Sequence, residues 1–323
     1  MNATDPAPEL TGQPLAAPPF AVQLPGCERR LAYAAHYWPA TLLNLLRPHR
    51  LQPAVPQPRL SAPVTIPAPL RRGWETLFDT DARCPLLTNQ SVGTLLYTRL
   101  FAQLGLNFRQ LLHVQHRTQH LAGAAALAGA QSQRLVCELH RCWRLPDGKA
   151  LVVLQTAIAR PDDEGGGLLA RVEDRFLIRR VPRPDWEQLP AVTQRAQVME
   201  LVGLRRRRAA LQAGAPGVSA VPLQLASDLG RRYGCVSGDH NPVHTTALAA
   251  RLFGLRRPFA QGLALRNLVV SELHRRGLPL QRLQLSFAQP AYLGQAVTLL
   301  LHEGAFELQD GGGQVLLFGS AEG

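Results

Sequence analysis

The segment GLALRNLVVSELHRRGLPLQRLQLSF, residues 262–287, contains two kinds of hydrophobic spacing. Its first part predicts a buried helix from about Gly262 to Arg276, because the apolar side chains recur at helical intervals (Leu265, Leu268, Val269 and Leu273). From Leu283 the apolar residues alternate with polar ones, as Leu285 and Phe287 continue the series, which predicts a strand with one buried face. A long helix followed by a strand is therefore expected in the second half.

The rest of the second half extends this pattern on both sides. Further strands are predicted at 297–302 and 314–319, and helices at 223–233 and 245–253. Gly254 follows the second of these helices, where glycine commonly ends a helix. One helix with several antiparallel strands favours an α+β fold.

The first half has the same order of elements. A helix is predicted over 94–106, followed by strands at 111–121, 134–145, 150–159 and 175–181, with a turn at 146–148. Because both halves place a buried helix ahead of antiparallel strands, we infer a divergent internal duplication. The predicted organisation is a proline-rich lead-in (1–70), a first domain (71–185), a linker (186–220) and a second domain (221–323).

Composition limits the function only broadly. The 323 residues carry a formal net charge of +12, which favours polyanionic partners such as nucleic acid, phosphorylated cofactors or an acidic carrier protein. Basic residues are not interleaved with aromatic ones, and aromatic residues make up 6% of the chain, so a nucleic-acid binder is the weaker interpretation. The five scattered cysteines form no CxxC pair, which favours free thiols over a zinc site.

The ends and hydropathy of the chain predict its location. No basic segment followed by an apolar run opens the sequence, and no stretch approaches the roughly 18 apolar residues of a membrane span. We therefore expect a cytoplasmic protein without a membrane span.

The string YGCVSGDHNPVH, residues 233–244, carries the predicted chemistry. Between two predicted helices, Gly238 and Pro242 shape a turn on which Asp239 and His244 face one cleft and share a water molecule. Such a pair suits the addition of water to an activated double bond, which needs one group to take a proton and another to deliver one. Taken singly, these residues would more often stabilise a turn or cap a helix.

This string resembles the signature SGDxNPxH of the MaoC-like dehydratases and (R)-specific enoyl-CoA hydratases, with Tyr233 as the preceding aromatic residue. The segments PFAQG (258–262) and FAQPAYLG (287–294) are similar to later parts of the same family. The resemblance implies two hotdog domains, each an antiparallel sheet wrapped around a central helix. It also implies reversible hydration of trans-2-enoyl thioesters to (3R)-hydroxyacyl thioesters.

The family pattern implies roles for individual residues. Asp239 and His244 would jointly activate water, and the backbone amide of Gly262 at a helix start would polarise the thioester carbonyl. Asn241, Ser237 and Gly238 would support the loop. The family usually has histidine where this chain has Gln261, from which we expect altered loop packing or substrate preference.

The first half contains no such string, so one active site per chain is expected, with TNQSVG (88–93) as the degenerate counterpart of the Gly262 region. No metal is required, because the histidines outside the string show no spacing with carboxylates that would specify a metal site. No redox cofactor is implied, and coenzyme A or phosphopantetheine would enter as part of the substrate. Arg256 and Arg257 are candidates for binding its phosphates. An acyl carrier protein and a second copy of the chain are candidate partners. A noncatalytic acyl-thioester-binding subunit and a hotdog thioesterase remain the alternatives.

Overall fold

The computed structural model of the chain describes residues 13–14, 59–106, 111–161, 167–182, 185, 187, 189–192 and 211–323. Most of the predicted lead-in and linker lies outside the described residues, so the predicted domain boundaries remain predictions. Among the described helices, none has both the length and the apolar composition needed to cross a bilayer.

One continuous sheet runs through the described part of the chain. Its eleven strands have the order β1-β2-β4-β5-β6-β3-β8-β11-β10-β9-β7. The first half supplies β1 (Gln13–Pro14), β2 (Arg59–Thr65), β3 (Leu111–His120), β4 (Ser132–Leu145), β5 (Lys149–Ala159) and β6 (Leu168–Ile178). The second half supplies β7 (Ser219–Gln224), β8 (Arg282–Phe287), β9 (Ala296–His302), β10 (Ala305–Asp310) and β11 (Val315–Glu322).

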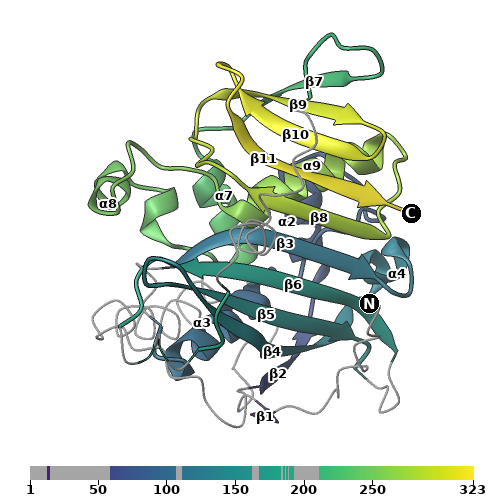
Figure 1. The fold of residues 1–323 in the computed structure, drawn as a ribbon. Helices are drawn as coiled ribbons and strands as arrows, with labels where there is room; N and C mark the ends of the chain where they lie inside the picture. Colours follow the sequence, from purple (N-terminus) through teal and green to yellow (C-terminus); the bar gives the residue numbers. More distant parts are fainter. Residues whose placement is uncertain are drawn as a thin grey trace.

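The halves meet where β3 pairs antiparallel with β8, with Gln115 opposite Ser286 and Thr118 opposite Leu283. Figure 1 shows these two strands side by side in the middle of the sheet. Outward from this seam the strand order is the same in both halves: the first strand after the long helix, then the fourth, third and second, and then the strand that precedes the helix. This shared order supports an internal duplication and the predicted α+β fold of two hotdog units.

Each half packs one long helix against its own strands. Helix α3 (Gln90–Gln103) and helix α9 (Gly262–Arg275) confirm the two predicted core helices. The apolar stripe predicted for the first is buried throughout (Leu95, Leu96, Leu100, Phe101 and Leu104). Leu265, Val269 and Leu273 occupy the corresponding core position in the second half.

Several predicted elements differ from the structure. The helix predicted at 223–233 is wrong in its first part, because residues 219–224 form edge strand β7 and helix α7 (Leu229–Ser237) begins later. Strand β10 was not predicted. Strand β2 lies inside the segment predicted to be a lead-in. Its Pro63 is accommodated because β1 pairs only with Leu60 and Ser61, so the far end of β2 behaves as an edge.

A helix from the first half of the sequence completes the second core. Helix α2 (Ala68–Phe78) buries Trp74 and Phe78 in the cluster that surrounds α9. The Trp74 ring meets the Tyr233 ring edge to face, with centroids 5.5 Å apart. Tyr233, the aromatic residue at the start of the string 233–244, is therefore a core residue that anchors α7.

Candidate active site

The string 233–244 begins in a helix and ends in a helical turn. Residues 233–237 belong to α7, so this helix extends four residues past its predicted end at Tyr233 and into the string. Gly238 ends the helix in the left-handed conformation, with φ of 74°, and its N–H donates to the Gly234 carbonyl at 2.9 Å. A single 3-10 turn, η2 (Pro242–His244), follows and leads to the short helix α8 (Ala247–Leu252).

Side chains of the string hold its own backbone in place. Ser237 Oγ donates to the Tyr233 carbonyl at 2.8 Å and accepts from the Asp239 N–H at 3.1 Å. Asp239 Oδ1 accepts from the Asn241 N–H, and Asn241 Oδ1 accepts from the Val243 N–H, both at 3.3 Å. These successive side-chain bonds aim Asp239 and His244 toward each other.

His244 lies opposite Asp239 with a defined proton arrangement. Its Nδ1 is 2.9 Å from the Phe259 carbonyl oxygen, which can only accept, so Nδ1 carries the hydrogen. In the neutral ring Nε2 then keeps its lone pair. Nε2 is 3.9 Å from Asp239 Oδ2, too far for a direct hydrogen bond but suited to a shared water molecule.

Two glycines allow α7 to press against this pair. A Cβ on Gly230 would lie 2.0 Å from the His244 carbonyl oxygen. One on Gly234 would lie 3.0 Å from the Asp239 carbonyl oxygen. The two glycines are one helical turn apart and face the same way, so this close approach depends on both. The sequence analysis did not single them out.

Gln261 joins α7 to the loop. Its side chain is 3% exposed, and Nε2 donates to the Gly230 carbonyl at 3.1 Å and to the Asp239 carbonyl at 3.4 Å. Its Oε1 is buried without a hydrogen-bond partner among the described residues. The amide thus supplies two donor bonds, one to α7 and one to the loop.

Gly262 opens α9 directly after Gln261. The first amide N–H groups of a helix lack intrahelical acceptors, so they are available to a bound carbonyl oxygen. The ring of Phe287 covers the α-carbon, since a Cβ at this position would lie 2.9 Å from it. A larger residue at this position would therefore force the Phe287 ring to move away from the start of α9.

The two candidate phosphate-binding residues lie on the surface beyond α8. Arg256 and Arg257 are exposed, and the Arg257 guanidinium carbon is 5.4 Å from the centre of the Tyr292 ring. The structure thus brings together Asp239, His244 and Gln261, with Gly262 next in the chain. It gives the two arginines no contact with that group.

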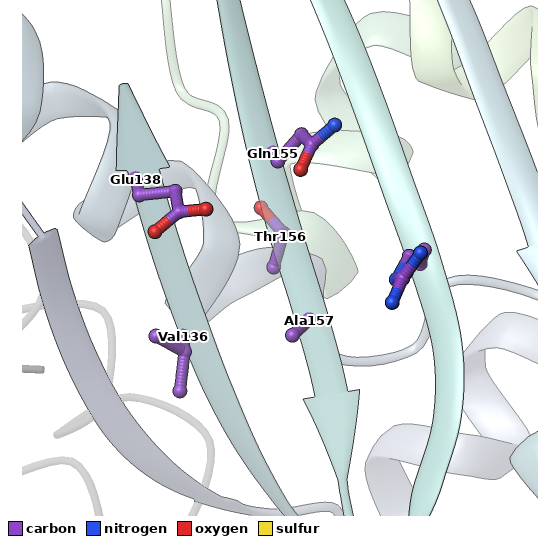
Figure 2. Close-up of a pocket in the computed structure, with 6 residues that line it drawn as sticks. Val136, Glu138, Gln155, Thr156 and Ala157 are labelled. Atoms are coloured by element: carbon purple, nitrogen blue, oxygen red, sulfur yellow. The ribbon is translucent and has the colours of Figure 1, made fainter. Parts of the chain in front are cut away.

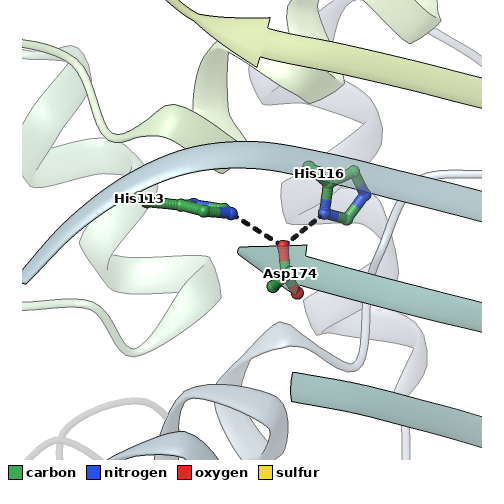
Figure 3. Close-up of side chains that lie close together, drawn as sticks. All are labelled: His113, His116 and Asp174. Atoms are coloured by element: carbon green, nitrogen blue, oxygen red, sulfur yellow. Dashed lines mark hydrogen bonds and ion pairs between the residues drawn. The ribbon is translucent and has the colours of Figure 1, made fainter. Parts of the chain in front are cut away.

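Sequence reasoning missed a second polar cluster, on the inner face of the seam. Asp174 on β6 has Oδ1 2.7 Å from His116 Nδ1 and 2.8 Å from His113 Nε2, and Figure 3 shows both imidazoles turned toward this carboxylate. Tyr97 donates its hydroxyl hydrogen to Oδ2. Each of these partners is at least 58 residues from Asp174 along the chain, so no local spacing could reveal the cluster.

Charge in this cluster is balanced by hydrogen bonding. Burial favours the neutral acid, but attraction to His116 and His113 and their hydrogen bonds outweigh it, so the pKa of Asp174 lies below its ordinary value. Burial lowers the pKa of His116, against the opposing attraction of the Asp174 carboxylate. Buried Arg266 on α9 supplies a nearby positive charge.

The three groups also form a candidate metal-binding set, since their ligand atoms all lie within 4.8 Å of one another. Each ligand atom already makes a hydrogen bond within the cluster. A divalent cation would add positive charge beside Arg266 in a buried region. The hydrogen bonds therefore explain the arrangement without an ion.

A shallow hollow on the first half lies on the strands β4, β5 and β6. Figure 2 shows Val136 and Glu138 on one strand and Gln155, Thr156 and Ala157 on the next. Glu138 is already paired with Arg59 at 2.5 Å. Because the hollow contains no residue of the string 233–244, it does not contribute to the candidate site.

Comparison with known sequences matches the second half of the chain. Residues 211–311 match the family described as "MaoC like domain". Over 93 residues the chain is 37% identical to 3-hydroxyacyl-thioester dehydratase X of Mycobacterium tuberculosis (strain ATCC 25618 / H37Rv). This match covers 29% of the present chain and 31% of that relative, so less than a third of its length is matched in sequence.

Comparison with solved structures extends the likeness to both halves. The crystal structure of HtdX from Mycobacterium tuberculosis superposes with a TM-score of 0.59 at 18% identity, covering 81% of this chain and 99% of that one. A MaoC-like dehydratase from Phytophthora capsici gives a TM-score of 0.55 at 13% identity, covering 82% and 95%. The peroxisomal multifunctional enzyme type 2 of Drosophila melanogaster gives 0.53 at 15% identity, covering 82% and 48%. These likenesses establish the fold.

Proposed function

We propose that this chain, which carries a MaoC like domain over residues 211–311, catalyses the reversible addition of water to trans-2-enoyl thioesters. The product would be the (3R)-hydroxyacyl thioester, and the reverse reaction its dehydration. The observation that carries the proposal is the facing pair of Asp239 Oδ2 and His244 Nε2, 3.9 Å apart, beside the start of α9. The relative named as a 3-hydroxyacyl-thioester dehydratase supports the same class of reaction.

Water activation follows from the proton arrangement of the pair. A water molecule between the two side chains donates one hydrogen to the His244 Nε2 lone pair and the other to the Asp239 carboxylate. Its oxygen is then positioned to form a bond to the β-carbon of the enoyl group while one of these side chains takes a proton. Acid and base catalysis of this kind contributes about 10² to 10⁴ in rate.

The start of α9 stabilises the negative charge that this addition produces on the thioester oxygen. As the C–O bond forms, the π electrons of the double bond move toward the thioester carbonyl and give an enolate. The amide of Gly262 and the positive end of the helix dipole stabilise that oxygen. The enolate then takes a proton at its α-carbon from the pair, which completes the addition of one water molecule.

The carrier part of the substrate, away from the reacting carbons, offers phosphates for binding. Coenzyme A or the phosphopantetheine of an acyl carrier protein carries phosphates, for which Arg256 and Arg257 offer exposed positive charge beyond α8. The net charge of +12 favours either acidic carrier. The reaction requires no redox cofactor, because water addition changes no net oxidation state.

The test is the loss of enoyl absorbance when purified protein is added to crotonyl-CoA and to a longer trans-2-enoyl-CoA. Chiral analysis identifies the product. We expect turnover to the (3R)-hydroxy thioester that falls by at least about 10² in Asp239→Asn and in His244→Ala, since each removes one partner of the water. Release of free thiol instead would identify a thioesterase. Binding without turnover, on coenzyme A and carrier-protein substrates alike, would identify a binding subunit.

A further inference from the structure

We propose that His113, contributed by the first half, binds a hydroxyl group on the acyl chain of the substrate. The inference rests on the proposed function for the identity of the substrate as an acyl thioester. It assigns a specificity role to a residue outside the string 233–244, and it concerns the part of the acyl chain beyond the reacting carbons.

A backbone irregularity brings His113 to the inner face of the sheet. Side chains three positions apart on a regular strand point to opposite faces. Between His113 and Gln115 the pairing of β3 with β6 shifts by one residue, so His113 and His116 reach the same oxygen of Asp174. Bulges of this kind re-aim side chains and are frequent beside active sites.

The hydrogen bonds of His113 determine which ring nitrogen is available. Its Nε2 faces two acceptors, the Asp174 carboxylate at 2.8 Å and the Gln115 carbonyl at 3.0 Å, so it carries a hydrogen. In the neutral ring Nδ1 is then an acceptor, and the hydrogen bond from Nε2 to the carboxylate fixes the orientation of the ring. A group that binds there must donate a hydrogen bond, as a hydroxyl does and a ketone does not.

Exposure distinguishes His113 from its partners. The side chains of Asp174 and His116 are 1% and 0% exposed, whereas that of His113 is 19% exposed. The network thus ends in one accessible imidazole. If the network served only to hold the seam together, its last member would not need to be exposed.

One aromatic ring separates His113 from the proposed carbonyl site. The His113 ring stacks on Phe176 at 4.7 Å and lies 4.8 Å from the centre of the Phe287 ring. Phe287 in turn covers Gly262, within 2.9 Å of where a Cβ would stand. A chain that leaves the Gly262 amide along Phe287 therefore meets an imidazole set among phenyl rings, where a hydrogen bond gains strength from the apolar surroundings.

The experiment measures binding of saturated acyl-pantetheines, the portion common to coenzyme A and carrier-protein thioesters. At each of several chain lengths, three forms carry a methylene, a ketone or a hydroxyl at the penultimate carbon. For the unmodified protein we expect the hydroxyl form to bind at least about fivefold more tightly than the other two at one chain length, the gain of one net hydrogen bond. Equal dissociation constants at every length would overturn the inference.

The variant His113→Phe keeps the stacking on Phe176 and Phe287 but removes both nitrogens. We expect it to abolish the hydroxyl preference while binding of the methylene form changes by less than about twofold. His302→Phe, a partly exposed histidine at the far end of β9, is the matched control and should keep the preference. A preference that survives in His113→Phe would also contradict the inference.

Turnover separates this inference from the proposed function. With the matching trans-2-enoyl thioesters, His113→Phe should raise the KM for the hydroxylated substrate more than the KM for the unsubstituted one, whereas His302→Phe should keep the ratio of the two KM values. Hydroxyl-selective binding without any hydration would overturn only the proposed function. Hydration with no selectivity among the three forms would overturn only the role of His113.

Discussion

A backbone carbonyl, and not a carboxylate, fixes the tautomer of His244. Because Phe259 oxygen accepts from Nδ1, the nitrogen that faces Asp239 is free to act as a base without first losing a proton. His113 has the reverse arrangement, in which Asp174 occupies Nε2 and leaves Nδ1 available. Different acceptors thus set the tautomers of the two imidazoles, in the way that the proposed proton transfer at His244 and the proposed hydroxyl binding at His113 require.

Buried histidines on β3 should make the protein sensitive to acid. Burial, together with the charges of Arg266 and His116, lowers the pKa of His120 from 6.5 to about 3. Its folded pKa lies below its unfolded one, so stability is fully present above about pH 6.5 and decreases as pH falls toward 3. From pH 7 to pH 5 this one group should cost about 2 kcal/mol of unfolding free energy.

Urea unfolding at several pH values measures this dependence. The lowered pKa of His116 adds to it in the same direction. In His120→Leu, which replaces the imidazole by an apolar side chain of similar size, the dependence between pH 7 and pH 5 should be weaker by about that amount. An unchanged slope in the variant would mean that His120 is not buried in its neutral form.

At the residue scale, sequence alone could identify the groups that lie close together along the chain. The proximity of Asp239 to His244 and the position of Gly262 at a helix start could be predicted, because one contiguous string and one helix start carry these residues. The partnership of His113 with Asp174 could not be found, because it depends on a bulge and on strand pairing across 61 residues. The close contact of Gly230 with His244 likewise depends on the angle at which α7 meets the loop.

At the scale of elements, the backbone of α7 serves as one wall of the site. Gly230 and Gly234 place that backbone against the carbonyls of His244 and Asp239, and Gln261 fastens the same turn from the other side. Substitution of Gly230 by alanine forces a Cβ to within 2.0 Å of the His244 oxygen unless the helix moves. Because backbone atoms cannot give way as a flexible side chain can, the loop must shift.

We therefore expect Gly230→Ala to lower both stability and hydration rate. Overpacking of this kind costs roughly 1 to 3 kcal/mol of unfolding free energy. The matched control is Gly93→Ala in α3, where a Cβ meets nothing within 4 Å. That variant should be stabilised by roughly 0.5 to 1 kcal/mol, since alanine suits a helix interior better. Thermal melts and kcat/KM measured for both variants test the pair, and equal effects would contradict the packing argument.

Elements were predictable where hydrophobic spacing was strong and long. Both core helices and most strands were located, because their buried faces repeat over ten or more residues or alternate cleanly. The error at 223–233 arose because Pro222 and Leu223 lie in an edge strand, where proline is tolerated, and the helix that follows was merged with it. Strand β10 was missed between two predicted strands.

At the scale of the whole molecule, the halves share one sheet, and the first half contributes residues to the second core. Trp74 and Phe78 of α2 complete the second core, although the sequence before residue 80 belongs to the first half. Sequence patterns showed the α2 segment as neither a separate element nor a part of the second half. Only the folded structure shows that α2 packs in the second core, because the contact of Trp74 with Tyr233 joins residues more than 150 positions apart.

Because α2 of the first half is part of the second core, we expect the chain to unfold as one unit. Calorimetry should give a single transition whose van't Hoff and calorimetric enthalpies agree. A fragment covering residues 211–323 should not fold alone, because it would lack Trp74 and Phe78 and would expose the edge of β8. Two resolved transitions, or a fragment with native-like dispersion in its NMR spectrum, would show that the halves are independent.

The pairing of β3 with β8 also affects how the protein responds to dilution. Two separate hotdog subunits would associate by mass action, and their shared surface would be lost at low concentration. Here both strands belong to one polypeptide, so each holds the other at a high effective concentration. The meeting of the two units is consequently first order. Because the two units are parts of one chain, the first need not have the same sequence as the second. His113 and Asp174 can therefore be present in the first unit alone, whereas in a symmetric dimer both units would contain them.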